Sequence, residues 1–280
     1  MTTIGLLHPG AMGAELGRQL VAAGHQVRWV TDGRSAATRD RADRARLTPC
    51  DSLPALVMAS DVVVSVCPPA SALDVARSVA AAGFRGLYLD ANAIAPETAQ
   101  VIATSVTDGG GGFVDGGIVG SPPARAGTTR LFLAGPLAPV AADLFTGTTV
   151  HAVVLGDSVG AASAAKAAYA GWTKASSALL LAVRSYARAW GVEGALLDEW
   201  SRSIPDLPER SDEEAARIHR KAWRFDGEMR EIESTLRATG LPSGFHHAAA
   251  EVFARLASLK DDPADQDPGA VLDRLRGSAS

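Results

Sequence analysis

One lysine in the middle of the chain has the surroundings of a catalytic acid or base. Lys166 lies in an alanine-rich stretch without proline, residues 159–190, which is predicted to form the longest helix of the chain. Small neighbouring side chains let other backbones approach, and the resulting desolvation brings the pKa of an amine towards the range useful for proton transfer. The alternative is a lysine whose stem packs on the surface while its amine stays in water. Tyr169 and Thr173 follow about one and two turns later.

The start of the chain combines an apolar run with a glycine-containing turn. Residues 2–7 are predicted to form a strand, and residues 8–13, HPGAMG, lead into an amphipathic helix. This order offers backbone N–H groups and a helix N-terminus to a dinucleotide diphosphate. A histidine stands at the first glycine position of the G-x-G-x-x-G pattern, so the two remaining glycines serve phosphate approach and helix packing. The cofactor contacts predicted here are His8, Gly10, Ala11, Met12 and Gly13.

The second predicted strand, residues 26–31, ends where dinucleotide-binding folds choose their cofactor. Asp32 could bind a free ribose 2′-hydroxyl, whereas Arg34 with Ser35 could bind a 2′-phosphate. We predict NADP(H), with NAD(H) as the alternative, because Gly33 and Arg34 are typical of an open loop before a helix that begins at Ser35. Asp32 and Ser35 could also do no more than cap a turn and a helix.

Two further predicted strands end in loops that carry candidate ligands. Residues 61–66 are a β-branched run typical of a strand covered on both faces, and Cys67 and Pro68 follow it. Residues 86–90 repeat the strand pattern and lead to Asn92. Because ligands bind at the carboxyl ends of parallel strands, we predict that these loops contact the cofactor. Cys67 is interpreted as a packing residue, since no basic residue stands nearby, and Asn92 could equally be a turn former.

Strand patterns stop after residue 157, and only helical patterns follow. Later strands are predicted to begin at residues 113–115 and to cover 131–134 and 149–155, and helices are predicted at 159–190, 193–203, 209–239 with a break near 225–227, and 243–260. The segment 116–130 is predicted to be too irregular for a helix, and the segment 261–270 to be a loop before a last short helix. We therefore predict an α/β fold: a doubly wound Rossmann-type domain over residues 1–157, then an all-α domain over residues 158–280.

The composition is that of an ordinary soluble protein. Hydrophobic residues make up 47% of the chain and charged residues 21%, and the net charge of −4 gives no reason to expect nucleic acid or an anionic membrane as a partner. No segment has the apolar length of a membrane span, and the N-terminus lacks the features of a secretion signal. Two isolated cysteines do not make a disulfide framework or a metal site. We predict a cytoplasmic protein without a metal.

The order of these motifs resembles the β-hydroxyacid dehydrogenases, a family related to 6-phosphogluconate dehydrogenase. The matching segments are residues 5–13, 90–96 (DANAIAP) and 115–127 (DGGIVGSPPARAG), together with Gly160 and Lys166. The resemblance implies that Lys166 exchanges a proton with the reacting oxygen of a small-molecule substrate while the nicotinamide carries hydride.

The resemblance also implies where the substrate binds. Asn92 matches a position in the substrate and nicotinamide loop, and Gly120 and Ser121 match the loop that elsewhere binds a substrate carboxylate. The sequence departs from the family at Val119, where a serine is common, and at Ala170, where an asparagine is common. The family's mode of carboxylate recognition therefore does not carry over. Tyr169 or Thr173 could supply the missing polar contact, or the substrate is not a simple hydroxy acid.

Two other functions remain open. Imine reductases share the two-domain plan and a proline-bearing loop similar to residues 121–123, but they generally lack the lysine, so Lys166 argues against them. A cofactor-binding protein without catalysis would keep the glycine turn and lose the environment of the lysine.

The C-terminal half resembles a variant helical domain found in a subgroup of these proteins, with the match at residues 227–253. Its apolar run at residues 178–183 predicts a homodimer, and the resemblance implies one too, because the family usually dimerises through this region. His246 and His247 stand at a predicted helix start, where an imidazole could cap the helix. Alternatively one of the two, His246 in our prediction, lines the substrate pocket together with Glu228 or Met229, from the helical domain or from the partner subunit.

Overall fold

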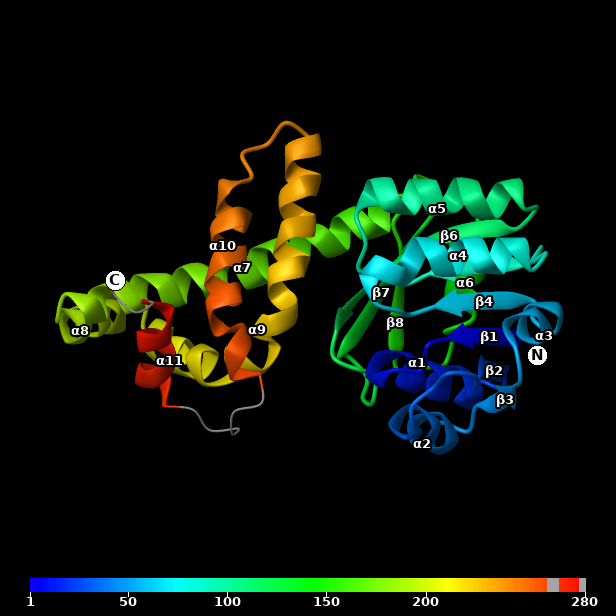
Figure 1. Ribbon diagram of the computed structural model, residues 1–280, viewed down its shortest axis with the longest axis horizontal. Helices are drawn as coiled ribbons and strands as arrows, with labels where there is room; N and C mark the ends of the chain where they lie inside the picture. Colours follow the sequence, from blue (N-terminus) through cyan, green and yellow to red (C-terminus); the bar gives the residue numbers. More distant parts are fainter. Residues whose placement is uncertain (261–266, 277–280) are drawn as a thin grey trace. The chain divides into compact units, whose positions relative to one another are not determined.

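The computed structural model describes residues 1–260 and 267–276 and divides into two compact units, residues 1–167 and residues 168–280 (Figure 1). The boundary falls inside the long helix α7 (Ala161–Ala189). The change from alternating strands and helices to helices alone comes after β8, as the sequence predicts.

The N-terminal unit is built on one sheet with the strand order β3-β2-β1-β4-β5-β6-β7-β8. The first six strands are parallel, β7 is antiparallel to β6, and β8 is parallel to β7. The strands are β1 (Thr3–Leu7), β2 (Gln26–Val30), β3 (Thr48–Cys50), β4 (Val62–Ser65), β5 (Leu87–Asp90), β6 (Gly112–Gly120), β7 (Thr129–Ala134) and β8 (Val150–Val154). This is a doubly wound α/β domain, which confirms the predicted fold class.

Helices cover both faces of the sheet, and each face has its own hydrophobic core. One core contains side chains of α1 (Ala11–Ala22), α2 (Ala36–Arg44) and α6 (Ala138–Asp143). The other contains side chains of α3 (Leu53–Met58), α4 (Ala72–Ala81) and α5 (Pro96–Asp108), and a short 3-10 turn (Pro69–Ser71) precedes α4. Figure 1 shows α4 and α5 on one side of the strands and α1 and α2 on the other. Burial on both faces explains why β4 is apolar throughout.

The structure corrects three predictions about secondary structure. The short edge strand β3 was not predicted, because its TPC sequence carries little strand signal. Strand β6 continues through residues 116–120, which were predicted to be irregular, because their glycines let neighbouring backbones come close. Helix α9 (Leu207–Ala238) runs without a break through residues 225–227. A Cβ at Gly227 would meet open space, and one helical glycine costs only about 1 kcal/mol.

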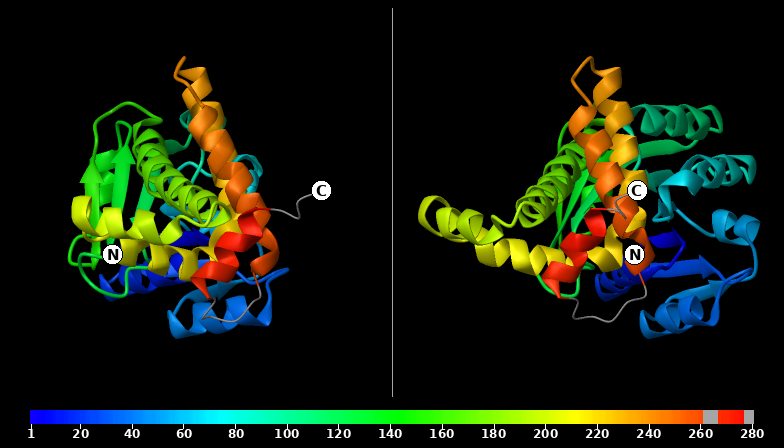
Figure 2. Two further views of the ribbon diagram at one scale, coloured as in Figure 1. Left: turned by 90° about the vertical axis from the view of Figure 1, so that its left-hand side faces the viewer. Right: turned by 60° about the vertical axis from the view of Figure 1, so that its left-hand side comes forward.

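The C-terminal unit consists of helices around a small apolar core. Besides the rest of α7 it contains α8 (Glu193–Ser203), α9, α10 (Gly244–Leu256), a 3-10 turn (Ala257–Leu259) and α11 (Pro268–Leu275). Helices α9 and α10 run side by side (Figure 2), and Phe225 meets Phe253 edge-on with their ring centroids 5.3 Å apart. The loop predicted over residues 261–270 lies partly outside the described residues, and α11 begins inside it, capped by Asp267.

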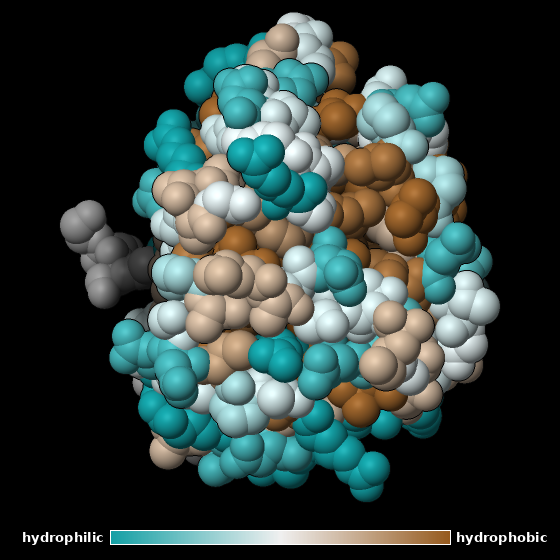
Figure 3. Space-filling model, turned by 90° about the vertical axis from the view of Figure 1, so that its right-hand side faces the viewer, coloured by the Kyte–Doolittle hydropathy of each residue, from teal (hydrophilic) through white to brown (hydrophobic). Residues whose placement is uncertain are grey.

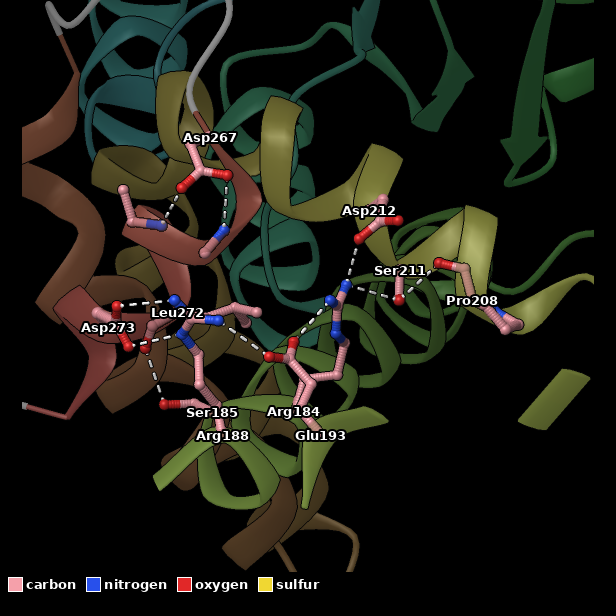
Figure 4. Close-up of polar contacts among 12 residues, drawn as sticks. Arg184, Ser185, Arg188, Glu193, Pro208, Ser211, Asp212, Asp267, Leu272 and Asp273 are labelled. Atoms are coloured by element: carbon pink, nitrogen blue, oxygen red, sulfur yellow. Dashed lines mark hydrogen bonds and ion pairs between the residues drawn. The ribbon is translucent and has the colours of Figure 1, made fainter. Parts of the chain in front are cut away.

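Charged side chains join four helices of this unit. The guanidinium of Arg184 on α7 is nearly buried and donates to Glu193, Asp212 and Ser211 (Figure 4). Arg188, one turn later, bonds both Glu193 and the carboxylate of Asp273 on α11. The network therefore fixes α8, α9 and α11 to α7. On the face shown in Figure 3, hydrophobic residues gather mainly toward the upper right, with hydrophilic ones around them.

Candidate cofactor and active site

The turn after β1 has the backbone geometry that a diphosphate site needs. His8 has a φ of 68°, in the left-handed region that glycine adopts easily, and its carbonyl accepts the N–H of Gly10 at 2.7 Å. A Cβ added to Gly13 would lie 2.6 Å from that carbonyl oxygen, so only glycine lets α1 start so close to the turn. A Cβ at Gly10 would meet nothing nearer than 4.0 Å, which leaves room for a phosphate.

The N-terminus of α1 is available to an anion. Its N-cap residue, Gly10, makes no side-chain cap, and the first turn holds no acidic residue. The backbone N–H groups at Ala11, Met12 and Gly13 therefore point their partial positive charge away from the helix without a competing side chain. A dinucleotide diphosphate fits this helix end both in charge and in space.

Arg34 adds positive charge to the same region. Burial, and then the charge of Arg34, lower the pKa of His8 to about 4, so the imidazole is neutral at physiological pH. The same arginine acts on the thiol of Cys67, whose pKa is nonetheless raised to about 11, mainly by burial. Cys67 is therefore a protonated packing residue, as its sequence context indicates, and not a nucleophile.

Arginine side chains bind the backbone of the loop after β2. Ser35 caps α2 by accepting the N–H of Thr38 at 3.3 Å, so its capping role is realised. Arg39 donates to the carbonyl oxygens of Thr31 and Arg34, and Gly33 has a φ of 66°. Asp32 is exposed. Arg41 on α2 reaches back to the carbonyl oxygen of Pro9 at 3.4 Å and thus joins this loop to the glycine turn.

Three polar residues lie side by side at the carboxyl ends of the central strands. The register pairs Ser65 of β4 with Asp90 of β5, and Asp90 with Asp115 of β6. All three are fully buried. Asn92 belongs to the same group: its side chain accepts the N–H of Cys67 at 2.6 Å and donates to Ser65 and Asp90.

Asp115 caps the helix that carries the lysine. One carboxylate oxygen accepts the N–H groups of Gly160, Ala162 and Ser163 at 2.9 to 3.0 Å, and the other accepts the Ser163 hydroxyl at 2.6 Å. These four bonds satisfy the first turn of α7 and fix where the helix begins. Asp115 was not predicted as a site residue, although an aspartate directly before two glycines at the end of a strand was the available signal.

Lys166 lies directly over β6. A Cβ at Gly117 would be 2.6 Å from the Ala162 carbonyl oxygen and 2.9 Å from the Cβ of Lys166, so this glycine lets α7 rest on the strand. Gly117 is two residues past Asp115, beyond the end of β5, and therefore on the same face at the carboxyl edge. The structure thus fixes the half-buried lysine at the edge where ligands of such sheets bind.

The loop after β6 turns sharply at Gly120, which has a φ of 111° and a backbone so close to Thr128 that no Cβ fits. The hydroxyl of Thr129 donates to the carbonyl oxygen of Ser121 at 2.5 Å, while the Ser121 side chain is exposed. The exposed side chain remains available to a ligand.

The remaining predicted substrate contacts belong to the C-terminal unit. Tyr169 is 47% exposed, and the hydroxyl of Thr173 donates to its carbonyl oxygen at 2.9 Å. His246 packs on α7, with its Nε2 2.9 Å from where a Cβ on Gly171 would lie. The idea that a histidine caps α10 is wrong, because no side chain caps this helix and the His246 ring packs on α7 instead.

The other residues proposed around His246 have structural partners. His247 lies 3.2 Å from Glu233 and 3.7 Å from Glu251 on the surface. Glu228 forms an ion pair with Lys174, and Met229 is fully buried in the core. Of this group only His246 has a buried ring nitrogen, Nδ1, without a hydrogen-bond partner among the described residues.

The fold is that of an NAD(P)-dependent dehydrogenase or reductase. Residues 2–142 match the family described as the NAD binding domain of 6-phosphogluconate dehydrogenase, and the chain belongs to this family. Residues 187–256 match a domain of unknown function, DUF1932. The resemblance found in the sequence is thereby confirmed.

Solved structures share the fold over the whole chain. A conserved protein of unknown function, described as structurally similar to 3-hydroxyacid dehydrogenases, is 27% identical, with a TM-score of 0.72 over 91% of this chain and 97% of that one. The 3-hydroxyisobutyrate dehydrogenase of Mycobacterium tuberculosis, solved with L-serine, is 22% identical, with a TM-score of 0.77 over 99% of each chain. An imine reductase of Streptomyces aurantiacus is 19% identical, with a TM-score of 0.54 over 96% of this chain and 98% of that one.

A comparison with curated proteins finds no match. Within the described residues, no helix has the length and apolar character needed to cross a bilayer.

Proposed function

We propose that this chain transfers hydride between NADP(H) and a small hydroxy or carbonyl substrate, with Lys166 as the general acid and base. The observation that carries the proposal is the fixation of Lys166 at the carboxyl edge, through the Asp115 cap and the contact with Gly117. NADP(H), when bound, supplies or takes up the hydride. The lysine amine holds the substrate oxygen by a hydrogen bond and gives it or takes from it the proton.

Replacing the lysine tests this proposal. Lys166→Ala should lower kcat by roughly 10²- to 10⁴-fold and leave the Kd for NADP(H) nearly unchanged, because the glycine turn binds the cofactor. Lys166→Arg should not restore activity, since a guanidinium stays protonated. The pH profile of oxidation should need a deprotonated group that is missing in the variant. Lys221→Ala, at an exposed lysine of α9, is the control and should keep full activity.

The second candidate is imine reduction, favoured by the fold shared with an imine reductase. A Lys166→Ala variant that keeps most of its activity would contradict the hydroxy or carbonyl mechanism. The next proton donor to test would then be Tyr169, by replacement with phenylalanine. Screening hydroxy acids, amino alcohols, aldehydes and cyclic imines with both cofactors would identify the substrate class.

The choice of NADP(H) rests on Arg34. Its charge reaches the glycine turn, and Arg39 and Arg41 surround the same loop. Arg34→Ala should weaken NADPH binding at least tenfold and leave NADH binding unchanged, measured by quenching of tryptophan fluorescence. Arg44→Ala, at an exposed arginine of α2, the helix that follows this loop, is the control. Tighter binding of NADH that is indifferent to the change at Arg34 would mean that Asp32 governs the choice.

His246 is the proposed substrate contact of the helical unit, because its Nδ1 is buried and has no hydrogen-bond partner in the part of the chain that the structure describes. His246→Ala should change KM or kcat strongly at an unchanged melting temperature. His247→Ala, on the surface next to it, should change neither.

The protein should also form a homodimer in the cytoplasm, as proposed from its sequence. An exposed apolar stripe on α7 supports association. It consists of Trp172 (74% exposed), Leu179 (61%), Val183 (38%), Tyr186 (67%) and Trp190 (71%). Their spacing of seven, four, three and four residues places them on one side of the helix over about 27 Å. Helix α8, which follows, contains no buried residue. We propose a second copy of the chain as the cover of this stripe.

A further inference from the structure

The side chain of Asn92 is already fully engaged. It is 3% exposed, its Oδ1 accepts the N–H of Cys67 at 2.6 Å, and its Nδ2 donates to Ser65 at 3.1 Å and to Asp90 at 3.0 Å. Both amide hydrogens and the carbonyl oxygen therefore have partners inside the protein. A side chain in this state contributes to a ligand site through the backbone that it holds.

Asp90 decides which way the Asn92 amide points. One oxygen of Asp90 accepts the backbone N–H of Asn92 and the other accepts its Nδ2, each at 3.0 Å. Above its pKa the Asp90 carboxylate only accepts hydrogen bonds, so it keeps the NH₂ end of the amide on its own side, and binding is therefore measured at about pH 8. The oxygen end must then face Cys67, where an N–H needs an acceptor.

We propose that Asp90 is a positioning residue for cofactor binding, which orients the Asn92 amide so that it holds the backbone of Cys67 and Pro68 in the shape that the cofactor contacts. The inference rests on the proposed cofactor role of this loop. Burial within the row of Ser65, Asp90 and Asp115 supports it, because a network buried in this way gains most from being fully satisfied.

Exchanging the side chains of residues 90 and 92 tests whether cofactor binding depends on the orientation of the Asn92 amide or only on the presence of both polar groups. Asp90→Asn replaces one of two acceptors by an NH₂ group, which must face either the backbone N–H or the NH₂ group of Asn92. Asn92→Asp brings two carboxylates face to face. The double variant, Asp90→Asn with Asn92→Asp, restores one donor opposite one acceptor and still offers an acceptor to the N–H of Cys67. The readouts are the Kd for NADPH, from tryptophan fluorescence, and the melting temperature of each variant.

Each single variant should raise the Kd for NADPH by roughly 10- to 100-fold, the loss expected when a hydrogen bond to a charged group is replaced by a clash. The double variant should recover a Kd within about threefold of the unchanged protein. Ser65→Ala removes one acceptor of the same NH₂ group and leaves Asp90 in place, so its Kd should rise no more than about threefold.

Three results would overturn the inference. If Asn92 contacts the ligand directly, the double variant stays as weak as Asn92→Asp. If the loop does not bind the cofactor, both single variants lose thermal stability and keep the original Kd. If Asp90 does not orient the amide, Ser65→Ala weakens binding as much as Asp90→Asn, and this comparison still holds if the exchange variants do not fold. Cofactor binding by the unchanged protein is measured first, so a failure of the proposed function appears there.

Discussion

Asp90 and Asp115 are neighbouring carboxyl groups with unequal surroundings. Asp115 accepts four hydrogen bonds from the start of α7, whereas Asp90 accepts two, both from Asn92. Burial, opposed by the two bonds from Asn92 and reinforced by the charge of Asp115, raises the pKa of Asp90 from 3.8 to about 7. The Asp90 carboxyl group therefore holds a proton below neutral pH.

This difference predicts how stability depends on pH. Between pH 4 and 7 the folded state keeps a proton on Asp90 that the unfolded state has released, so this group lowers the free energy of unfolding as pH rises through that range. Asp90→Asn removes the effect. The difference in unfolding free energy, variant minus unchanged protein, should increase from pH 5 to pH 7, by up to about 1.4 kcal/mol per pH unit, and then level off. Urea unfolding at several pH values measures it.

A control uses Asp108→Asn, at an exposed carboxyl group of α5. Its difference from the unchanged protein should not vary over the same range. A flat difference for Asp90→Asn as well would mean that Asp90 is ionised in the folded state throughout.

Helix α7 carries the lysine, but β6 decides where the helix starts. Asp115→Asn retains the size of the side chain and loses its charge, and an amide cannot accept the Ser163 hydroxyl and three N–H groups as well as a carboxylate does. We expect a loss of about 1.5–3 kcal/mol in unfolding free energy and a lower kcat at an unchanged Kd for NADP(H), because Lys166 moves and the glycine turn does not. Urea unfolding and steady-state kinetics provide both measurements.

Ser163→Ala is the matched variant, since it removes one of these four bonds. It should lose less stability and keep most of kcat. Equal loss of kcat in both variants would mean that the hydroxyl of Ser163, and not the cap as a whole, positions the lysine.

The sequence predicts the elements that have strong local patterns, and it misses those that depend on distant backbone. Strand β4 and helix α7 were found from their own residues. The continuation of β6 was missed, because Gly116 and Gly117 are weak strand formers. Glycine is needed at these positions because the Asp90 backbone and α7 come too close for a side chain. The break predicted in α9 was wrong, since a glycine alone does not end a helix.

In the candidate site, too, features with a local pattern were predicted and features that depend on distant residues were missed. Lys166 and the glycine turn follow from residue type and spacing. The cap made by Asp115 could not be predicted, because its partners are 45 to 48 residues away in the chain. The orientation of Asn92 could not be predicted either, because the N–H that its oxygen accepts belongs to Cys67, 25 residues away. The cofactor and substrate roles of these residues remain predictions.

At the scale of the whole molecule, the stripe on α7 is the surface for which we propose a partner. Its exposed apolar side chains follow one another along a single helix. Burial of an aromatic side chain removes roughly 150–250 Å² from water, so Trp172, Tyr186 and Trp190 alone would contribute strongly to association.

Charges placed in the stripe should separate the dimer. The double variant Tyr186→Asp with Trp190→Glu should sediment as a monomer at micromolar concentration, where the unchanged protein should sediment as a dimer. Trp223→Glu, at an aromatic of α9 that is also about half exposed, should leave the dimer intact. A monomeric unchanged protein would contradict the proposal directly.

The cap made by Asp115 also sets an order of events in folding. Its partners follow it by 45 to 48 residues, and β7, α6 and β8 lie between them. Closing so long a loop is slow compared with forming a helix from its own residues. The alanine-rich α7 can therefore wind early, while its first turn locks onto the sheet only after β6 is in place. The lysine would reach its final position in one of the last steps on the way to the native state, later than the helix that carries it.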